Sequence, residues 1–357
     1  MRKIRFLLSL LIFASFFSLP GAFGKTPEDS FVFTAVGDFG ATPNTTAVLE
    51  GISGTDSSFH LAVGDLSYNQ IRPESAWRDY VRAHLRKNLP FEVLSGNHEE
   101  NGYNGLIDDF TKVFPDELGA VGDYGKEYTF DFPKINPLAR FILISPATHF
   151  KVGGTYSYDK GNKHYAWLSK QIDGARNSGI RWVIVGMHKN CLSAGSKSCE
   201  IGEDLLNLLV KKKVDLVLQG HDHNYQRTKA LGTGGACQEI RAGFYNPACV
   251  ADAGKKDEVF EKGAGTIIVI VGTGGHSNYS IDKRDPEAPY FAKLIGDKHH
   301  PTYGFGLFTV SADEIKGKFV PCKKGLLSLL FKDEFHIVDS GYRLSHKQVI
   351  QPEKPQI

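Results

Sequence analysis

The sequence predicts an α/β fold in which buried sheets are flanked by helices. Short and almost entirely apolar segments, such as residues 31–36, 59–63 and 182–186, alternate with segments of helical periodicity. Strands of this composition are typically buried on both faces of a sheet. Most of these segments also end at a glycine with a polar residue close by. In such folds ligands bind at the carboxyl ends of the strands, so this edge is where we expect a functional site.

The expected elements follow along the chain in this order. Strands at residues 31–36, 59–63 and 91–94 come first, with a helix at 73–86 before the third strand. The remaining elements are strands at 128–132, 141–145, 182–186, 214–218 and 266–271, helices at 162–177 and 201–210, and a hairpin of 305–311 with 315–320. The 162–177 helix is supported by an apolar stripe of Tyr165, Leu168 and Ile172.

Composition and charge exclude several classes of protein. The chain has 357 residues, of which 41% are hydrophobic and 23% charged, which excludes collagen, a long coiled coil and a disordered chain. The formal net charge is only +2, and its basic residues form no extended cluster. A chain so close to neutral has no general electrostatic attraction to nucleic acid, so we expect no nucleic-acid partner.

The first 24 residues are predicted to be a signal peptide. Residues 1–5 are basic, residues 6–19 are apolar apart from three serines, and residues 22–24 offer a site for cleavage. The apolar run is shorter than the roughly 20 residues that span a bilayer, although an uncleaved anchor remains the alternative. We therefore expect a secreted or periplasmic protein without a stable membrane anchor. A single folded domain that carries the functional site is expected at 25–325, followed by a C-terminal extension at 326–357 that packs on the domain or trails from it.

The five cysteines fit an oxidising compartment. Cys191 and Cys199 form one close pair, Cys237 and Cys249 form another, and both pairs lie in polar segments rich in glycine and serine. Each pair is expected to close its own loop as a disulfide, which leaves Cys322 without a partner. A zinc site built from cysteines is the alternative, but no C-x-x-C spacing occurs.

Seven side chains of metal-ligating type follow the predicted strand ends. They comprise two carboxylates, one phenol, one amide and three imidazoles: Asp38, Asp65, Tyr68, Asn97, His188, His221 and His223. Taken singly, the aspartates suit turns or helix caps, and the histidines suit a core or a surface. Together, seven ligands are too many for one ion but suit two ions that share a carboxylate.

Five motifs in order resemble those of the calcineurin-like metallophosphoesterases. They are Gly37-Asp38-Phe39-Gly40, Gly64-Asp65-Leu66-Ser67-Tyr68, Gly96-Asn97-His98-Glu99, Met187-His188 and Gly220-His221-Asp222-His223. A tyrosine three places after the second aspartate is also found in the purple acid phosphatase branch of this family. The chain resembles the compact single-domain form of that branch. The resemblance covers residues 31–311. It implies a four-layer α/β/β/α sandwich, in which two mixed sheets are flanked by helices, with a dinuclear site.

The resemblance also implies a role for each residue. Asp38, Tyr68 and His223 would bind Fe(III), and the hard phenolate and carboxylate donors suit that ion. Asn97, His188 and His221 would bind a divalent ion (Fe, Zn or Mn), and Asp65 would bridge the two ions. His98 would bind a phosphate oxygen or protonate the leaving group, oriented by Glu99 or another carboxylate. No residue is assigned to the rest of the substrate.

The implied function is a secreted phosphomonoesterase of the acid phosphatase type, which hydrolyses small phosphate esters by a metal-bound hydroxide. The alternatives are a phosphodiesterase acting on cyclic nucleotides or phospholipid head groups, an iron-dependent redox protein, and a non-catalytic secreted binding protein. The sequence departs from the family in having no second histidine at 189–202, and it resembles the compact form without the N-terminal β domain of the large plant enzymes. An insert at 228–263 follows the last motif. We expect this insert to form one wall of the cleft or a surface loop without a role.

Overall fold

The structure is a computed structural model that describes residues 30–100, 102, 104–254, 257–296, 302–322 and 332–349. The predicted signal peptide at 1–24 lies outside the described residues, as do parts of the 326–357 extension. Within the described ranges, no helix combines the length and apolarity needed to cross a bilayer.

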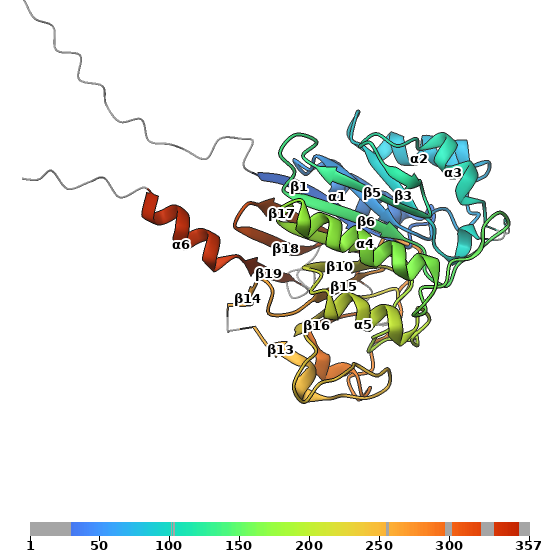
Figure 1. Ribbon diagram of the computed structural model, residues 1–357. Helices are drawn as coiled ribbons and strands as arrows, with labels where there is room; N and C mark the ends of the chain where they lie inside the picture. The colour runs from blue at the N-terminus through green and yellow to red at the C-terminus, as the bar shows by residue number, and fades with distance from the viewer. Residues whose placement is uncertain are drawn as a thin grey trace, which may run out of the picture.

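Two large mixed sheets form the centre of the molecule (Figure 1). The seven-stranded sheet has the order β14 (Val259–Glu261), β19 (Asp333–Val338), β18 (Glu314–Pro321), β17 (Gly304–Ser311), β1 (Ser30–Val36), β2 (Phe59–Val63) and β3 (Phe91–Leu94). The eight-stranded sheet has the order β16 (Phe291–Ile295), β11 (Tyr225–Thr228), β15 (Ile267–Val271), β10 (Leu216–Gln219), β9 (Trp182–Gly186), β6 (Ala139–Ile144), β5 (Glu127–Phe132) and β4 (Val121–Asp123). Within each sheet, the strands that carry the functional motifs are parallel neighbours.

Aromatic side chains fill the space between the two sheets. Phe33 of β1 meets Phe141 of β6 edge to face, with ring centroids 5.1 Å apart. Phe59 of β2 meets Phe130 of β5 in the same way, at 5.6 Å. All four rings are buried. This packing explains why the strands read as continuous apolar runs, since their other faces lie under helices.

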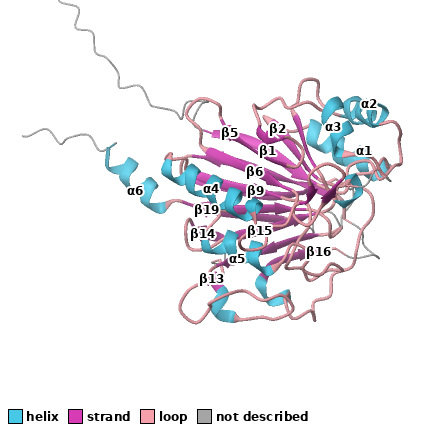
Figure 2. Ribbon diagram, turned by 45° about the vertical axis from the view of Figure 1, so that its right-hand side comes forward, coloured by secondary structure: helices cyan, strands magenta, loops and turns pink. Residues whose placement is uncertain are grey.

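Helices cover the outer faces of both sheets, which confirms the predicted four-layer sandwich (Figure 2). On the seven-stranded sheet, α1 (Pro43–Ser53) packs against β17 and α3 (Ile107–Val113) against β3, with α2 (Glu74–His84) between these helices. On the eight-stranded sheet, α4 (Lys163–Asn177) packs against β6, and α5 (Glu203–Lys211) leads into β10. Side-chain caps begin α1 and α4, at Thr42 and Asn162.

The chain beyond residue 325, the domain boundary that we expected, contributes a strand to the sheet. β19 pairs with β18 on one side and with β14 on the other, and α6 (Ser340–Val349) follows it. Phe335 and Ile337 of β19 are buried. Residues 333–338 are therefore part of the seven-stranded sheet.

Both predicted disulfides are present. Cys191 is bonded to Cys199 and Cys237 to Cys249. Cys322 is a free thiol whose pKa is raised to about 12 by burial. The pairing leaves no set of cysteines among the described residues that could form the alternative zinc site.

Candidate metal centre

The predicted ligands follow the carboxyl ends of five strands that lie side by side in the two sheets. Four of the seven have a backbone that residues other than glycine rarely adopt: φ is 67° at Asp38, 53° at Asp65, 49° at Tyr68 and 68° at His221. Left-handed backbone at several side chains of one cluster is a feature of functional sites, because the surrounding structure has to hold it. The ligand cluster is therefore built from sharp turns that aim side chains at one point.

Glycine is required next to these turns because the chains approach closely. A Cβ atom at Gly96 would lie 2.1 Å from Oδ1 of Asp65, and one at Gly220 would lie 2.8 Å from Oδ2 of Asp38. Any larger residue would push the two carboxylates away from their positions. The glycines at the strand ends therefore permit the convergence that the sequence predicted.

One group of donor atoms gathers around the phenol of Tyr68. Its hydroxyl donates to Oδ1 of Asp38 at 2.9 Å and lies 3.0 Å from Nε2 of His223. Nε2 of His223 lies 3.1 Å from the same Asp38 oxygen. Asp38 and His223 are buried. Three donors of different chemistry thus converge within hydrogen-bond distance of one another.

A second group gathers around the imidazole of His188. Its Nε2 lies 3.1 Å from Oδ2 of Asp65 and 3.2 Å from Nδ1 of His221. Oδ2 of Asp65 also accepts from the Tyr68 hydroxyl at 3.0 Å. Asp65 is consequently the member that both groups share, with His188 and His221 on one side and Asp38 and His223 on the other.

Asn97 supplies an independent test of whether this donor set fits metal ions. Its Oδ1 atom is buried and has no hydrogen-bond partner among the described residues. Leaving such an oxygen without a partner costs about 1–3 kcal/mol. An amide oxygen is a metal ligand, so an ion bound within reach of Asn97 would remove this cost. The residues present therefore fit a metal centre.

The electrostatics of the cluster favour bound positive charge. Burial alone would raise the pKa of Asp38, but His223 and His188 outweigh it and the pKa is lowered. Burial alone would lower the pKa of His188, but Asp65 and Asp38 raise it to about 9. For Tyr68, burial and the two carboxylates together hold the pKa well above its usual value. Two buried carboxylates thus attract a proton wherever no other cation neutralises them.

His98 stands beside this cluster with its side chain 31% exposed, against 1% for Asp65. Its backbone N–H donates to Oδ1 of Asp65 at 3.0 Å. The expectation that Glu99 orients the imidazole is wrong, because that carboxylate instead accepts from the backbone N–H groups of Asp65, Leu66 and Gly96. The side chain that contacts Nδ1 of His98 is Asn104, at 2.7 Å.

Two further contributors were missed in the sequence. Glu200 places Oε1 2.7 Å from Nε2 of His221, and the segment His276–Tyr279 packs on Tyr68 and His223. A signal for the second existed: His276 follows β15 and a run of glycines, the same pattern that marks the ligands. No sequence pattern predicted that Glu200 contacts His221; the only notable feature of Glu200 in the sequence is that it follows Cys199.

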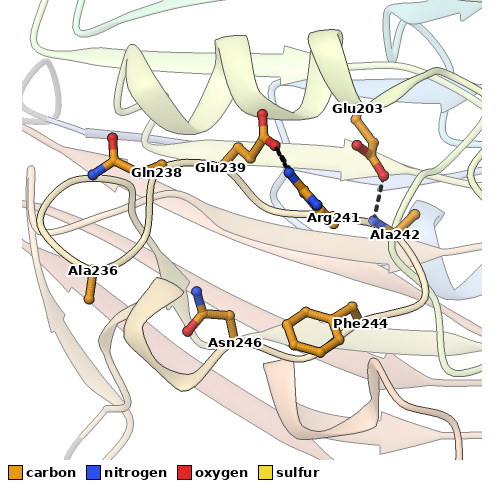
Figure 3. A pocket seen from close by; sticks show the side chains of 8 residues that line it. All are labelled: Glu203, Ala236, Gln238, Glu239, Arg241, Ala242, Phe244 and Asn246. Carbon is orange, nitrogen blue, oxygen red and sulfur yellow. Dashed lines mark hydrogen bonds and ion pairs between the residues drawn. The ribbon is translucent and has the colours of Figure 1, made fainter.

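The insert at 228–263 forms a pocket of its own (Figure 3). The pocket has a volume of about 580 Å³ and is lined by Glu203, Ala236, Gln238, Glu239, Arg241, Ala242, Phe244 and Asn246. The insert is attached to α5 there, since the backbone N–H of Ala242 donates to Oε1 of Glu203 at 2.9 Å. None of the lining residues is a predicted ligand, so this pocket is distinct from the metal-ligand cluster.

Fold and site together define a class: an α/β/β/α sandwich with a cluster of metal ligands at the carboxyl ends of its strands. A sequence model of the calcineurin-like phosphoesterase family matches residues 31–225. The chain belongs to this family, as its motifs predicted.

The relatives support the purple acid phosphatase branch. Purple acid phosphatase 18 of Arabidopsis thaliana is 26% identical over 224 residues, which are 59% of this chain and 48% of that protein. Fe(3+)-Zn(2+) purple acid phosphatase 12 of the same plant is 24% identical over 297 residues, 80% of this chain and 58% of that protein. The chain spans about half the length of the first curated relatives that it matches.

A solved structure has the same fold. The purple acid phosphatase PPD1 from yellow lupin (Lupinus luteus) seeds aligns with a TM-score of 0.60 and 20% identity, over 92% of this chain and 57% of that chain.

Proposed function

We propose that this protein is an exported dinuclear-metal phosphomonoesterase of the acid phosphatase type. The observation that carries the proposal is the pair of ligand groups that share Asp65. One carboxylate common to two sets of donors is what two adjacent cations require. Family membership and the purple acid phosphatase relatives support a phosphoric ester as the substrate.

In this proposal the two groups hold different ions. Asp38, Tyr68 and His223 hold Fe(III), since a phenolate and a carboxylate are hard anionic donors. Asn97, His188 and His221 hold a divalent ion (Fe, Zn or Mn), and Asp65 bridges the pair. The Fe(3+)-Zn(2+) relative supports such a combination. When bound, two such ions lower the pKa of a coordinated water and orient the phosphate for in-line displacement.

His98 is the residue that we propose to contact the substrate. Its imidazole is partly exposed, whereas Asp65 is buried, and its Nε2 lies 3.7 Å from Oδ2 of Asp65. With Asn104 contacting Nδ1, the other ring nitrogen, Nε2, is left to donate a proton to the departing oxygen or to bind a phosphate oxygen. Because residues 189–202 contain no histidine, protonation of the leaving group falls to His98.

Export is the second part of the proposal. The basic and apolar residues at 1–24 are typical of a signal peptide, and two disulfides are typical of proteins in an oxidising compartment. Expression with residues 1–24 in a suitable host, followed by N-terminal sequencing, tests this part. We expect the mature chain in the extracytoplasmic fraction, starting near residue 25; full-length chain in the cytoplasm would contradict export.

The activity is tested on purified protein with a panel of aryl phosphate monoesters and diesters. We expect about two ions per chain and a kcat/KM for monoesters above that for diesters. A higher value for diesters would favour the phosphodiesterase. Two bound ions without hydrolysis of either ester would contradict the hydrolase and favour the redox or binding protein.

A further inference from the structure

The segment that follows β15 runs tightly against the turn that carries Asp38. The backbone N–H of Gly274 donates to the carbonyl of Gly37 at 2.9 Å, and that of His276 donates to the carbonyl of Asp38 at 3.1 Å. Gly275 has φ = 132°, and a Cβ atom there would lie 2.4 Å from the backbone nitrogen of Thr45. The glycines let this chain pass between the Asp38 turn and the start of α1.

The next residues of the segment hold His223 from several sides. Oγ of Ser277 lies 2.6 Å from Nδ1 of His223. The ring of Tyr279 stacks on the imidazole, with centroids 4.1 Å apart and planes 6° apart. The backbone N–H of Tyr279 donates to the carbonyl of His223 at 2.9 Å. The imidazole is therefore fixed at Nδ1 and on one face, which leaves Nε2 directed at Asp38 and Tyr68.

His276 stacks on the ring of Tyr68. The two centroids are 3.6 Å apart and the planes differ by 14°, so the rings lie face to face. Stacking of this kind restricts the rotation of the phenol about its side-chain bonds. Each of Asp38, Tyr68 and His223 is thus contacted by at least one residue of the segment His276–Tyr279.

Ligands of the other group are supported by different elements. Nδ1 of His188 lies 2.9 Å from the carbonyl of Val63, and Nε2 of His221 lies 2.7 Å from Glu200. Of the described residues in His276–Tyr279, none has a hydrogen bond or ring contact with His188 or His221 in the structure. Any effect of the segment should therefore be selective for one group.

Resting on the proposed function, we propose that His276–Tyr279 is a positioning segment for the metal ion held by Asp38, Tyr68 and His223. Ser277 fixes the ring orientation and tautomer of His223, so that Nε2 serves as the ligand. His276 holds the phenol of Tyr68 by stacking. Neither residue touches the substrate in this account; both act through a ligand.

The experiment uses the reconstituted protein with both ions bound. His276→Ala removes the stacked ring, His276→Phe keeps a ring without nitrogen atoms, and Ser277→Ala removes the contact to His223. His84→Ala is the matched control, because His84 packs against Tyr80 on α2, with centroids 5.2 Å apart and away from the centre. Each variant is checked for its thermal unfolding midpoint, then dialysed against a chelator while each metal is quantified per chain over time.

We expect His276→Ala and Ser277→Ala to bind one of the two ions about 10- to 100-fold more weakly. These two variants should bind the other ion as tightly as the wild type does. His276→Phe and His84→Ala should bind both ions as tightly as the wild type. In the iron-loaded protein, the visible band from Tyr68 and Fe(III) should shift in His276→Ala and stay in place in His84→Ala.

Three results would overturn the proposal. Metal retention in His276→Ala and Ser277→Ala equal to the wild type would show that the segment does not position these ligands. Equal loss of both ions would show that the effect is not selective. A loss in His276→Phe as large as in His276→Ala would contradict the stacking role. If His276→Ala does not fold, His276→Phe and Ser277→Ala still decide the outcome, whereas wild-type protein that binds no metal would overturn the proposed function itself.

Discussion

The two halves of the candidate centre differ in their donors and also in the residues that support those donors. The half with Asp38, Tyr68 and His223 is backed by a segment attached to β15, with ring stacking and several backbone hydrogen bonds. In the other half, His221 is backed by the carboxylate of Glu200, whose side chain is 32% exposed. Glu200 follows the loop that the Cys191–Cys199 disulfide closes.

In the proposed two-ion centre, this difference in support would give the two ions different rates of exchange. A ligand held by packed rings and backbone loses little freedom when the ion binds, so that ion should exchange slowly. His221, which is held by a partly exposed carboxylate, is less constrained, so its ion should exchange faster. We therefore expect the ion held by His188 and His221 to be replaced by another metal more readily than the ion of the other half.

The largest effect is expected for Asp65→Ala, because Asp65 belongs to both halves. Both ions should be lost and hydrolysis should fall to background, as measured by metal analysis and an aryl phosphate assay. Retention of one ion at full occupancy would show that the halves are independent and would remove the shared carboxylate from the account.

His98→Ala should separate catalysis from metal binding. His98 is adjacent to the ligands but is not counted among them, so both ions should stay bound while kcat falls about 10²- to 10⁴-fold. His149→Ala, an exposed histidine on β7 (His149–Phe150), is the control. An unchanged kcat in His98→Ala would refute its role, and loss of metal would place it among the ligands.

Glu200→Ala should weaken only the ion held by His188 and His221, by about 10- to 100-fold. Glu200→Gln should lose less, since its amide oxygen can still accept from Nε2 of His221. Competition with a chelator measures the affinity of each ion. Equal weakening of the binding of both ions would show that the two halves do not differ in this way.

Reduction of the Cys191–Cys199 disulfide should also weaken the binding of the ion held by His188 and His221, as Glu200→Ala does.

A smaller effect is expected on the stability of the fold. The free energy of unfolding should depend on pH through one buried carboxyl group, that of Glu92, which lies outside both halves. Glu92 on β3 is buried with Oε2 unpaired, and burial raises its pKa to about 7. Stability that depends on its protonation is fully present below its usual pKa of 4.5 and is lost as the pH rises through about 7. The free energy of unfolding should fall by about 3 kcal/mol over this range.

Glu92→Gln should remove this pH dependence and leave the binding of both ions unchanged. Thermal unfolding midpoints between pH 4.5 and 8 provide the measurement, with Glu50→Gln on α1 as an exposed control. A wild-type midpoint that rises with pH in this range, and does so equally in Glu92→Gln, would contradict the assignment.

The layers and the ligand turns were predictable because they depend on local patterns. Apolar runs such as β9 and β10 are buried on both faces, and glycine at their ends marks the turns. α1 was not predicted, because its first residues, Pro43 to Thr46, are mostly polar and show no apolar periodicity at that end. β19 alternates exposed and buried residues, yet its place in the sheet depends on β14 and β18, which are remote in the chain.

The supporting residues were beyond the reach of the sequence. Glu200 precedes His221 by 21 positions, and Ser277 follows His223 by 54. Neither contact has a spacing rule, since each depends on how a loop returns over the sheet. Asn104, rather than Glu99, contacts Nδ1 of His98 for the same reason. Ligand identity follows from motifs, whereas ligand support follows from tertiary packing.

The central claim is that seven side chains hold two neighbouring ions, and a metal inventory of the purified protein tests it most directly. Elemental analysis of the wild type beside Asp65→Ala, with ester hydrolysis measured on the same samples, is the decisive experiment. The account predicts about two ions per wild-type chain, none in the variant, and hydrolysis only where the ions are present. Wild-type protein that takes up no stoichiometric metal, or that hydrolyses esters equally well without it, would contradict the account.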